Sequence, residues 1–63
     1  MEKMLRAKTL IYEQDITQIE LARALKISET RLSRILNGRD QARPVELSQL
    51  ANELGVSETD LVS

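Results

Sequence analysis

The sequence of 63 residues contains no cysteine and no histidine. This excludes disulfide bridges, zinc sites built from these two residues, and the side chain that most often carries protons near neutral pH. Aromatic residues are nearly absent too, since Tyr12 is the only one, and we expect it to be a partly buried packing residue. A chain this short buries a modest core, so its stability has to come from packing or from self-association.

Long hydrophobic runs are also missing. No segment approaches the roughly 20 apolar residues that span a bilayer, and no apolar signal-peptide core follows Met1 to Met4. There is no glycine-rich phosphate loop, and no histidine or cysteine that would serve as base or nucleophile. We therefore expect a protein of the bacterial cytoplasm that has no membrane partner, is not an enzyme and needs no cofactor or metal.

Charge is distributed unevenly, although the formal net charge is only −1. Residues 1–25 hold four basic and four acidic side chains. Residues 26–43 hold five basic side chains against two acidic ones, a net charge of +3, whereas residues 44–63 hold four acidic side chains and no basic one. We expect one basic surface and an acidic C-terminal end that a phosphate backbone repels.

The spacing of apolar residues predicts an all-α chain with one domain over residues 1–63. Leucine and isoleucine recur at helical rather than alternating spacing, and only one proline and two glycines interrupt them. Thr17 with Glu20 forms the pattern of a capping box, and Ser28 is placed to cap the next helix. The five predicted helices cover about Glu2 to Glu13, Thr17 to Leu25, Ser28 to Asn37, Pro44 to Leu54, and a short stretch after Ser57.

The segment from Gln18 to Gly38 has the pattern of a helix-turn-helix. Two short helices are joined by about three residues, and the small residue Ala22 stands at the fifth position, where the helices of such a motif cross closely. Apolar residues stand at positions four, eight, ten, fifteen and eighteen, where they tie the two helices together: Leu21, Leu25, Ile27, Leu32 and Ile35.

In these features the chain resembles the Cro and phage-repressor family of bacterial helix-turn-helix regulators, also called the xenobiotic-response-element type. The segments that carry the resemblance are Thr17-Gln18 with Leu21-Ala22, Leu32-Ser33-Arg34-Ile35 with Asn37-Gly38, and Leu50-Ala51 with Leu54-Gly55-Val56-Ser57. The resemblance implies a compact five-helix, lambda-repressor-like DNA-binding domain in which helices two and three form the helix-turn-helix.

Two turn residues depart from the family pattern. Lys26 stands at the turn of the motif and Asp15 at the end of the first helix, where the family usually has glycine. A left-handed conformation costs a non-glycine residue roughly 1–2 kcal/mol, and aspartate tolerates it better than most residues. We expect strain or a reshaped turn at Lys26.

The resemblance implies that the helix from about Glu29 to Asn37 lies in the major groove of DNA. Arg34 is the strongest candidate for reading a base, because a guanidinium can bind guanine O6 and N7 together. Glu29 is either an acceptor for a cytosine amino group or only a helix-start residue favoured by the dipole. The predicted DNA-binding residues are Gln18, Ser28, Glu29, Thr30, Arg31, Ser33, Arg34, Asn37, Arg39 and Arg43.

The other members of this set have simpler roles. Thr30 and Ser33 are permissive base readers, and the resemblance implies that Gln18 contacts a phosphate at a helix N-terminus, unless it is only a good helix former. Flanking phosphate contacts are expected from Asn37, Arg31, which points sideways, and Arg39 and Arg43, which have the alternative of being solvated loop charges.

We therefore predict sequence-specific binding to double-stranded DNA by a small transcriptional repressor associated with the nucleoid. A domain of this size covers one half-site, so we expect a homodimer on a palindromic operator. The dimer surface is expected at the acidic C-terminal end, with Leu61, Val62 and either Val45 or Val56. The alternative is an antitoxin-like or adaptor module whose acidic C-terminal helices bind a protein.

Overall fold

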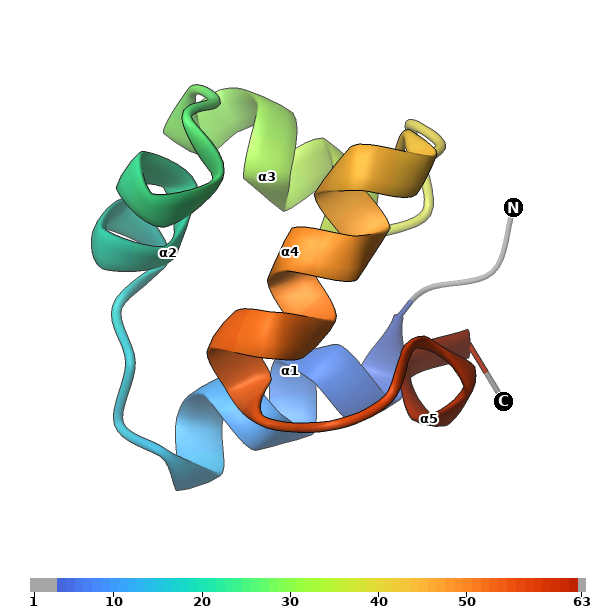
Figure 1. Cartoon of the computed structure of the whole chain (residues 1–63). Coiled ribbons are helices and arrows are strands. Elements are labelled where there is room, and N and C mark those ends of the chain that lie inside the picture. Colours follow the sequence, from blue (N-terminus) through green and yellow to red (C-terminus); the bar gives the residue numbers. More distant parts are fainter. Residues whose placement is uncertain (1–3, 63) are drawn as a thin grey trace.

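A computed structural model describes residues 4–62, except for the side chain of Val62. All regular structure in this part of the chain is helical, as predicted. Residue Glu2, where the first helix was expected to begin, lies outside the described residues. The five helices are α1 (Leu5–Glu13), α2 (Gln18–Leu25), α3 (Glu29–Leu36), α4 (Pro44–Leu54) and α5 (Glu58–Val62) (Figure 1).

The predicted starts of α2 and α3 are confirmed, whereas α1 begins at Leu5, after Met4. The Thr17 hydroxyl accepts a hydrogen bond from the backbone N–H of Glu20 at 3.1 Å, and the Glu20 carboxylate accepts from the Thr17 N–H at 3.4 Å. The Ser28 hydroxyl likewise accepts from the N–H of Arg31 at 3.0 Å. These caps satisfy backbone donors that have no partner inside the helix, so they fix where α2 and α3 begin.

Helices α1 to α4 all end in the same backbone turn. A residue with left-handed conformation (Asp15, Lys26, Gly38 or Gly55) stands at each end, with φ between 57° and 74°. The next residue then donates its N–H to the carbonyl five residues earlier, over 2.8 to 3.1 Å. This is the Schellman arrangement. The turn at Lys26 therefore keeps the regular geometry, and the non-glycine residue carries the strain.

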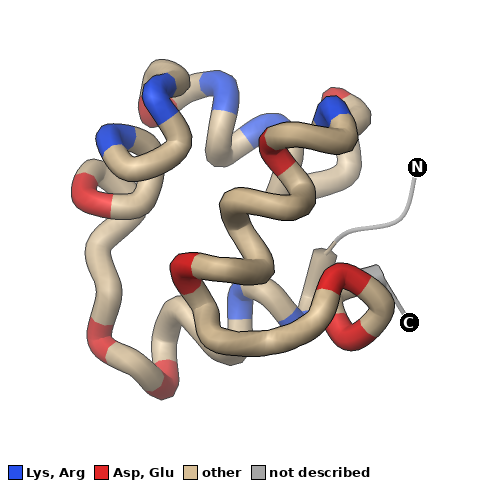
Figure 2. The backbone as a smooth tube through the Cα atoms, viewed as in Figure 1, with Lys and Arg blue, Asp and Glu red and all other residues tan. Residues whose placement is uncertain are grey.

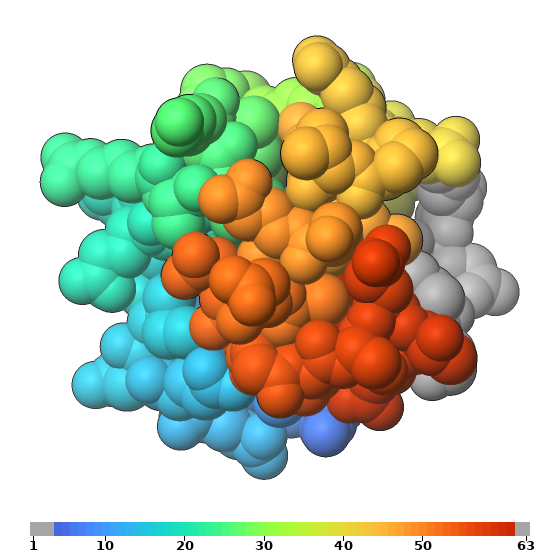
Figure 3. Space-filling model, in the orientation of Figure 1, coloured from blue at the N-terminus to red at the C-terminus, as the bar shows by residue number. Residues whose placement is uncertain are grey.

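The core is built from leucine, isoleucine and alanine of all five helices. Ala22 is 3% exposed in α2, which has its most extensive helix-to-helix contact with α3. Helix α4 runs from the α3 end of the domain to the α1 and α5 end, and its side chains fill the middle of the face in Figure 3. The buried apolar residues are Ala7, Leu10, Ile11, Leu21, Ala22, Leu25, Leu32, Ile35, Leu36, Leu50, Ala51, Leu54 and Leu61.

Two predictions about individual apolar residues are wrong. Tyr12 was expected to be partly buried, but it is 86% exposed because it lies on the outer side of α1, away from Leu10 and Ile11. Leu61 was expected on a dimer surface, but it is only 2% exposed because α5 folds back and packs on α1 and α4. Val45 remains exposed at 66%, Val56 is half-buried, and the side chain of Val62 lies outside the described part.

Candidate DNA interface

The outward face of α3 forms one side of a shallow polar hollow on the surface. The start of α2 and the turn after α3 supply its other edges. Seven of the ten predicted DNA-binding residues line it: Gln18, Glu29, Thr30, Ser33, Arg34, Asn37 and Arg39. The apolar residues of the same helix, Leu32, Ile35 and Leu36, are buried on the opposite side. Helix α3 therefore separates a core-facing side from a side on which donors and acceptors are collected.

Ser28, Arg31 and Arg43 are the predicted residues that do not line the hollow. Ser28 is the N-cap of α3, and its hydroxyl is engaged with the backbone of Arg31. Arg43 is exposed at the start of α4, where its backbone N–H donates to the Glu46 carboxylate at 2.8 Å. In the sequence, Ser28 directly precedes Glu29 of the hollow, and Arg43 lies four residues after Arg39.

Arg31 has protein partners where a phosphate was expected. Its Nη2 lies 2.7 Å from Oε1 of Glu46 and its Nε 3.3 Å from Oε2, so the guanidinium binds this carboxylate with two parallel bonds. Its Nη1 also lies 3.3 Å from Oδ2 of Asp40. The Glu46 side chain is 6% exposed, so the pair joins α3 to α4 in a largely desolvated place. In this structure Arg31 therefore links α3 to α4.

Arg34 makes a second two-point ion pair, which is more exposed. Its Nε lies 3.0 Å from Oδ2 of Asp40 and its Nη2 3.1 Å from Oδ1, while 49% of the Arg34 side chain is accessible to solvent. Asp40 comes from the turn after α3, and its backbone N–H donates to the carbonyl of Arg34 at 3.2 Å. Asp40 therefore holds Arg34 at the rim of the hollow.

These pairs keep all four groups ionised. The pKa of Asp40 is lowered because Arg34, and then Arg31, donate to its carboxylate, which outweighs the effect of desolvation. The pKa of Glu46 is lowered mainly because Arg31 donates to it, with help from the Arg43 backbone N–H. The pKa values of Arg31 and Arg34 are raised by the same bonds.

Two residues of this site were missed from the sequence. The Nζ of Lys8 in α1 donates to Oδ1 of Asn37 at 2.9 Å, and the Asn37 amide donates to the Ser33 carbonyl at 2.9 Å. Lys8 thus brings a cation to the end of α3 from 29 residues away in sequence. Asp40 was counted only as a charge opposing the basic segment. Its spacing of six residues from Arg34 was the one local signal of the pairing.

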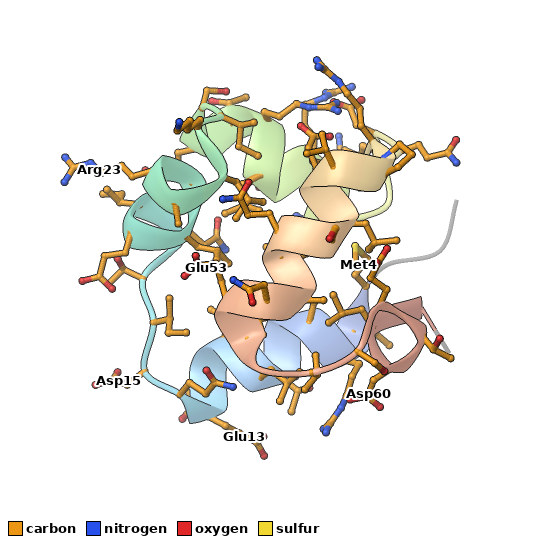
Figure 4. All side chains as sticks on the ribbon, viewed as in Figure 1. Met4, Glu13, Asp15, Arg23, Glu53 and Asp60 are labelled. Carbon is orange, nitrogen blue, oxygen red and sulfur yellow. The ribbon has the colours of Figure 1, made fainter. Side chains whose placement is uncertain are left out.

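Charge follows the arrangement expected from the sequence. Figure 2 shows Lys and Arg concentrated over α2, α3 and the turn that follows, with acidic residues prominent at the far ends of α1 and α4 and on α5. Arg23 projects from α2 into solvent at the basic end, and Asp60 lies at the opposite end (Figure 4). The polar hollow is thus on the side of the domain that attracts a polyanion.

Helices α2 and α3 are joined by a tight turn, and a polar, positively charged hollow lies over α3. This arrangement is typical of a helix-turn-helix DNA-binding domain. The comparison with protein families agrees, since the family described as helix-turn-helix matches residues 5–61. The chain therefore belongs to the Cro/C1-type helix-turn-helix family, a family of DNA-binding domains.

Two further comparisons gave no significant match, one with curated proteins and one with solved structures. Within residues 4–62, no helix is both long and apolar enough to cross a membrane.

Proposed function

We propose that this chain acts as a single domain, residues 1–63, that represses transcription by binding a specific sequence of double-stranded DNA in the bacterial cytoplasm. Helix α3 with its C-cap residue, about Glu29 to Asn37, enters the major groove. The observation that carries this proposal is the polar hollow over α3. Its seven lining residues supply donors and acceptors, and no large apolar side chain is among them.

The residues divide into base readers and phosphate contacts. Arg34 reads a guanine, Glu29 accepts from a cytosine amino group, and Thr30 and Ser33 contact neighbouring base edges. Gln18 binds a phosphate at the N-terminus of α2. Asn37, Arg39 and Arg43 hold the backbone on one flank. Ser28 and Arg31 contribute by placing α3, because their polar groups are bonded within the protein.

A symmetric homodimer on a palindromic operator fits the size of the domain, because one copy of α3 covers a single half-site. Burial of Leu61 removes one of the residues expected at the dimer surface. Among the residues expected at that surface whose side chains are described, Val45 at the start of α4 is exposed and stays available for a partner copy.

The test is selection of bound duplexes from a random DNA pool, followed by titration of the enriched duplex at two salt concentrations. We expect a palindromic consensus and an affinity that falls steeply with salt. Arg34→Ala should weaken preference at one base position roughly 10-fold to 100-fold. Arg43→Ala should weaken all duplexes alike, and Arg23→Ala, which removes the same charge from a side chain that projects away from α2, serves as the control.

The competing function is an adaptor or antitoxin-like module, and the acidic surface of α4 and α5 favours it. Glu53 and Glu58 are exposed there, and residues 44–63 contain no basic side chain. A pure adaptor enriches no DNA sequence and keeps its activity in Arg34→Ala. Absence of both enrichment and a salt slope in the selection experiment therefore overturns the DNA-binding proposal in favour of this one.

A further inference from the structure

Asp40 stands at the centre of a chain of ion pairs that ends at the hollow. One carboxylate oxygen, Oδ2, lies 3.0 Å from Nε of Arg34 and 3.3 Å from Nη1 of Arg31. Arg31 is itself held by both oxygens of Glu46. The Asp40 backbone is fixed as well, since its N–H donates to the Arg34 carbonyl. The position of Asp40 is therefore set by α3 directly, and by α4 through Arg31.

Asp40 binds only one edge of the Arg34 guanidinium. A guanidinium has five N–H donors in a planar fork. The edge formed by Nε and Nη2 is on Asp40, which leaves the other edge, formed by Nη1 and the second hydrogen of Nη2, without an acceptor among residues 4–62. Arg34 lines the hollow, which is where a base pair would enter, so its free edge is available to that base pair. Two parallel donors match the O6 and N7 acceptors of guanine.

We propose that Asp40 is a specificity-determining positioning residue, which holds Arg34 so that its free edge meets a guanine in the major groove. This inference rests on the proposed DNA-binding function. A long arginine side chain loses conformational freedom when it binds, and a carboxylate that orders it beforehand removes part of that cost. The negative charge also lowers the attraction of this region for phosphates in general. By ordering Arg34 and by weakening the general attraction for phosphates, Asp40 thus favours the specific complex over the non-specific one.

The experiment compares Asp40→Asn with the wild-type chain in the same random-pool selection. Asparagine has the shape of aspartate but lacks the charge that binds a guanidinium at two points. The matched control is Asp60→Asn, which removes a carboxylate paired with Arg6 at 3.6 Å at the opposite end of the domain. Both variants raise the net charge by one, so the control separates the change in net charge from the loss of the contact with Arg34.

We expect Asp40→Asn to lower the guanine preference at the position read by Arg34 by about fivefold to tenfold. Its affinity for random duplex should be equal to or higher than that of the wild-type chain. Asp60→Asn should leave the guanine preference unchanged. In the Arg34→Ala background, Asp40→Asn should have no further effect at that position, because the coupling between the two residues is already removed.

A purely structural role for Asp40 predicts a different pattern. Asp40→Asn would then lower thermal stability and weaken all duplexes equally while retaining the wild-type base preference, which overturns the inference. The same holds if Asp40→Asn changes that preference equally in the Arg34→Ala background. If the wild-type chain itself selects no sequence, the proposed function fails and the inference fails with it. If the wild-type chain selects a sequence but Asp40→Asn keeps the same base preference, only the inference fails.

Discussion

The ends of α1, α2 and α4 differ from the end of α3 in the side chain that follows the turn, although the same type of backbone turn closes all four helices. After the left-handed residue, α1, α2 and α4 continue with Ile16, Ile27 and Val56, and each of these packs against the core. After Gly38, the same position carries Arg39, which is exposed. An apolar residue at this position usually accompanies the turn, so α3 ends without the contact that secures the other three helices.

A carboxylate in the turn after α3 is bound back to the helix in place of that apolar contact. Asp40 binds Arg31 and Arg34, and Glu46 binds Arg31 from α4. The same backbone turn therefore forms whether the side chain after it is apolar or charged. Three helix ends use that side chain for stability, whereas the end beside the hollow keeps it polar and basic, which suits contact with a phosphate backbone.

Removing the apolar contact at one of the three ordinary ends should have the largest effect. Ile27→Ala should lower the free energy of unfolding by about 2 kcal/mol, the lower end of the range for such truncations, because Ile27 is only partly buried. Urea unfolding measures this change. Ile19→Ala, at a half-exposed position of α2, is the control and should cost clearly less. Equal losses in the two variants would contradict the role given to the closing turn.

The charged end should respond to loss of the Glu46 charge. Glu46→Gln keeps the shape of the side chain but loses the ion pair with Arg31, so we expect a loss of about 1–2 kcal/mol in urea unfolding. Glu53→Gln changes an exposed carboxylate on the same helix and should be close to neutral.

Acid should weaken the same end of the wild-type chain. Because ion pairing lowers the pKa of Glu46 and of Asp40 in the folded chain, their stabilisation is present above the pKa values of the unfolded chain. It is lost as the pH falls through the lower, folded values. Glu46→Gln should therefore show a weaker loss of stability below pH 4 than the wild-type chain. Parallel acid profiles would show that the pair contributes little.

The helix ends could be predicted from the sequence because their chemistry is local. Thr17 with Glu20, Ser28 and Gly55 act within three to five residues, and the spacing of leucine and isoleucine marks the buried face of each helix. The hollow followed from the same local information, since the outward positions of α3 are fixed once Leu32 and Ile35 are known to face inward.

The contacts between different helices could not be predicted, because they depend on how the helices cross. Arg31 and Glu46 are 15 residues apart and meet only because the fold brings α3 and the start of α4 together, and Lys8 reaches Asn37 from α1. The burial of Leu61 has the same origin, since α5 turns back onto α1 and α4. A pattern along one helix contains no information on these distances.

The left-handed conformation of Lys26 allows the contribution of the turn itself to be tested, with a smaller expected effect. Lys26→Gly should raise the free energy of unfolding by about 0.5–1 kcal/mol, because relief of the left-handed strain is partly offset by the flexibility of glycine in the unfolded chain. Asp15→Gly should gain less, because aspartate adopts this conformation more readily. A loss of stability in Lys26→Gly would mean that the lysine side chain makes a stabilising contact.

Arg39→Ala should have the smallest effect on stability and is the sharpest test of the exceptional helix end. The side chain is exposed, so the free energy of unfolding should change by less than about 0.5 kcal/mol. If the position serves DNA, the same variant should weaken binding to all duplexes alike and reduce the slope of log affinity against log salt by about one. Arg23→Ala is the control of equal charge. If Arg39→Ala loses as much stability as Ile27→Ala, Arg39 secures its helix end as the apolar residues secure theirs. If it binds DNA as tightly as Arg23→Ala, Arg39 has no role in DNA binding. Either result contradicts the difference drawn between the end of α3 and the other three.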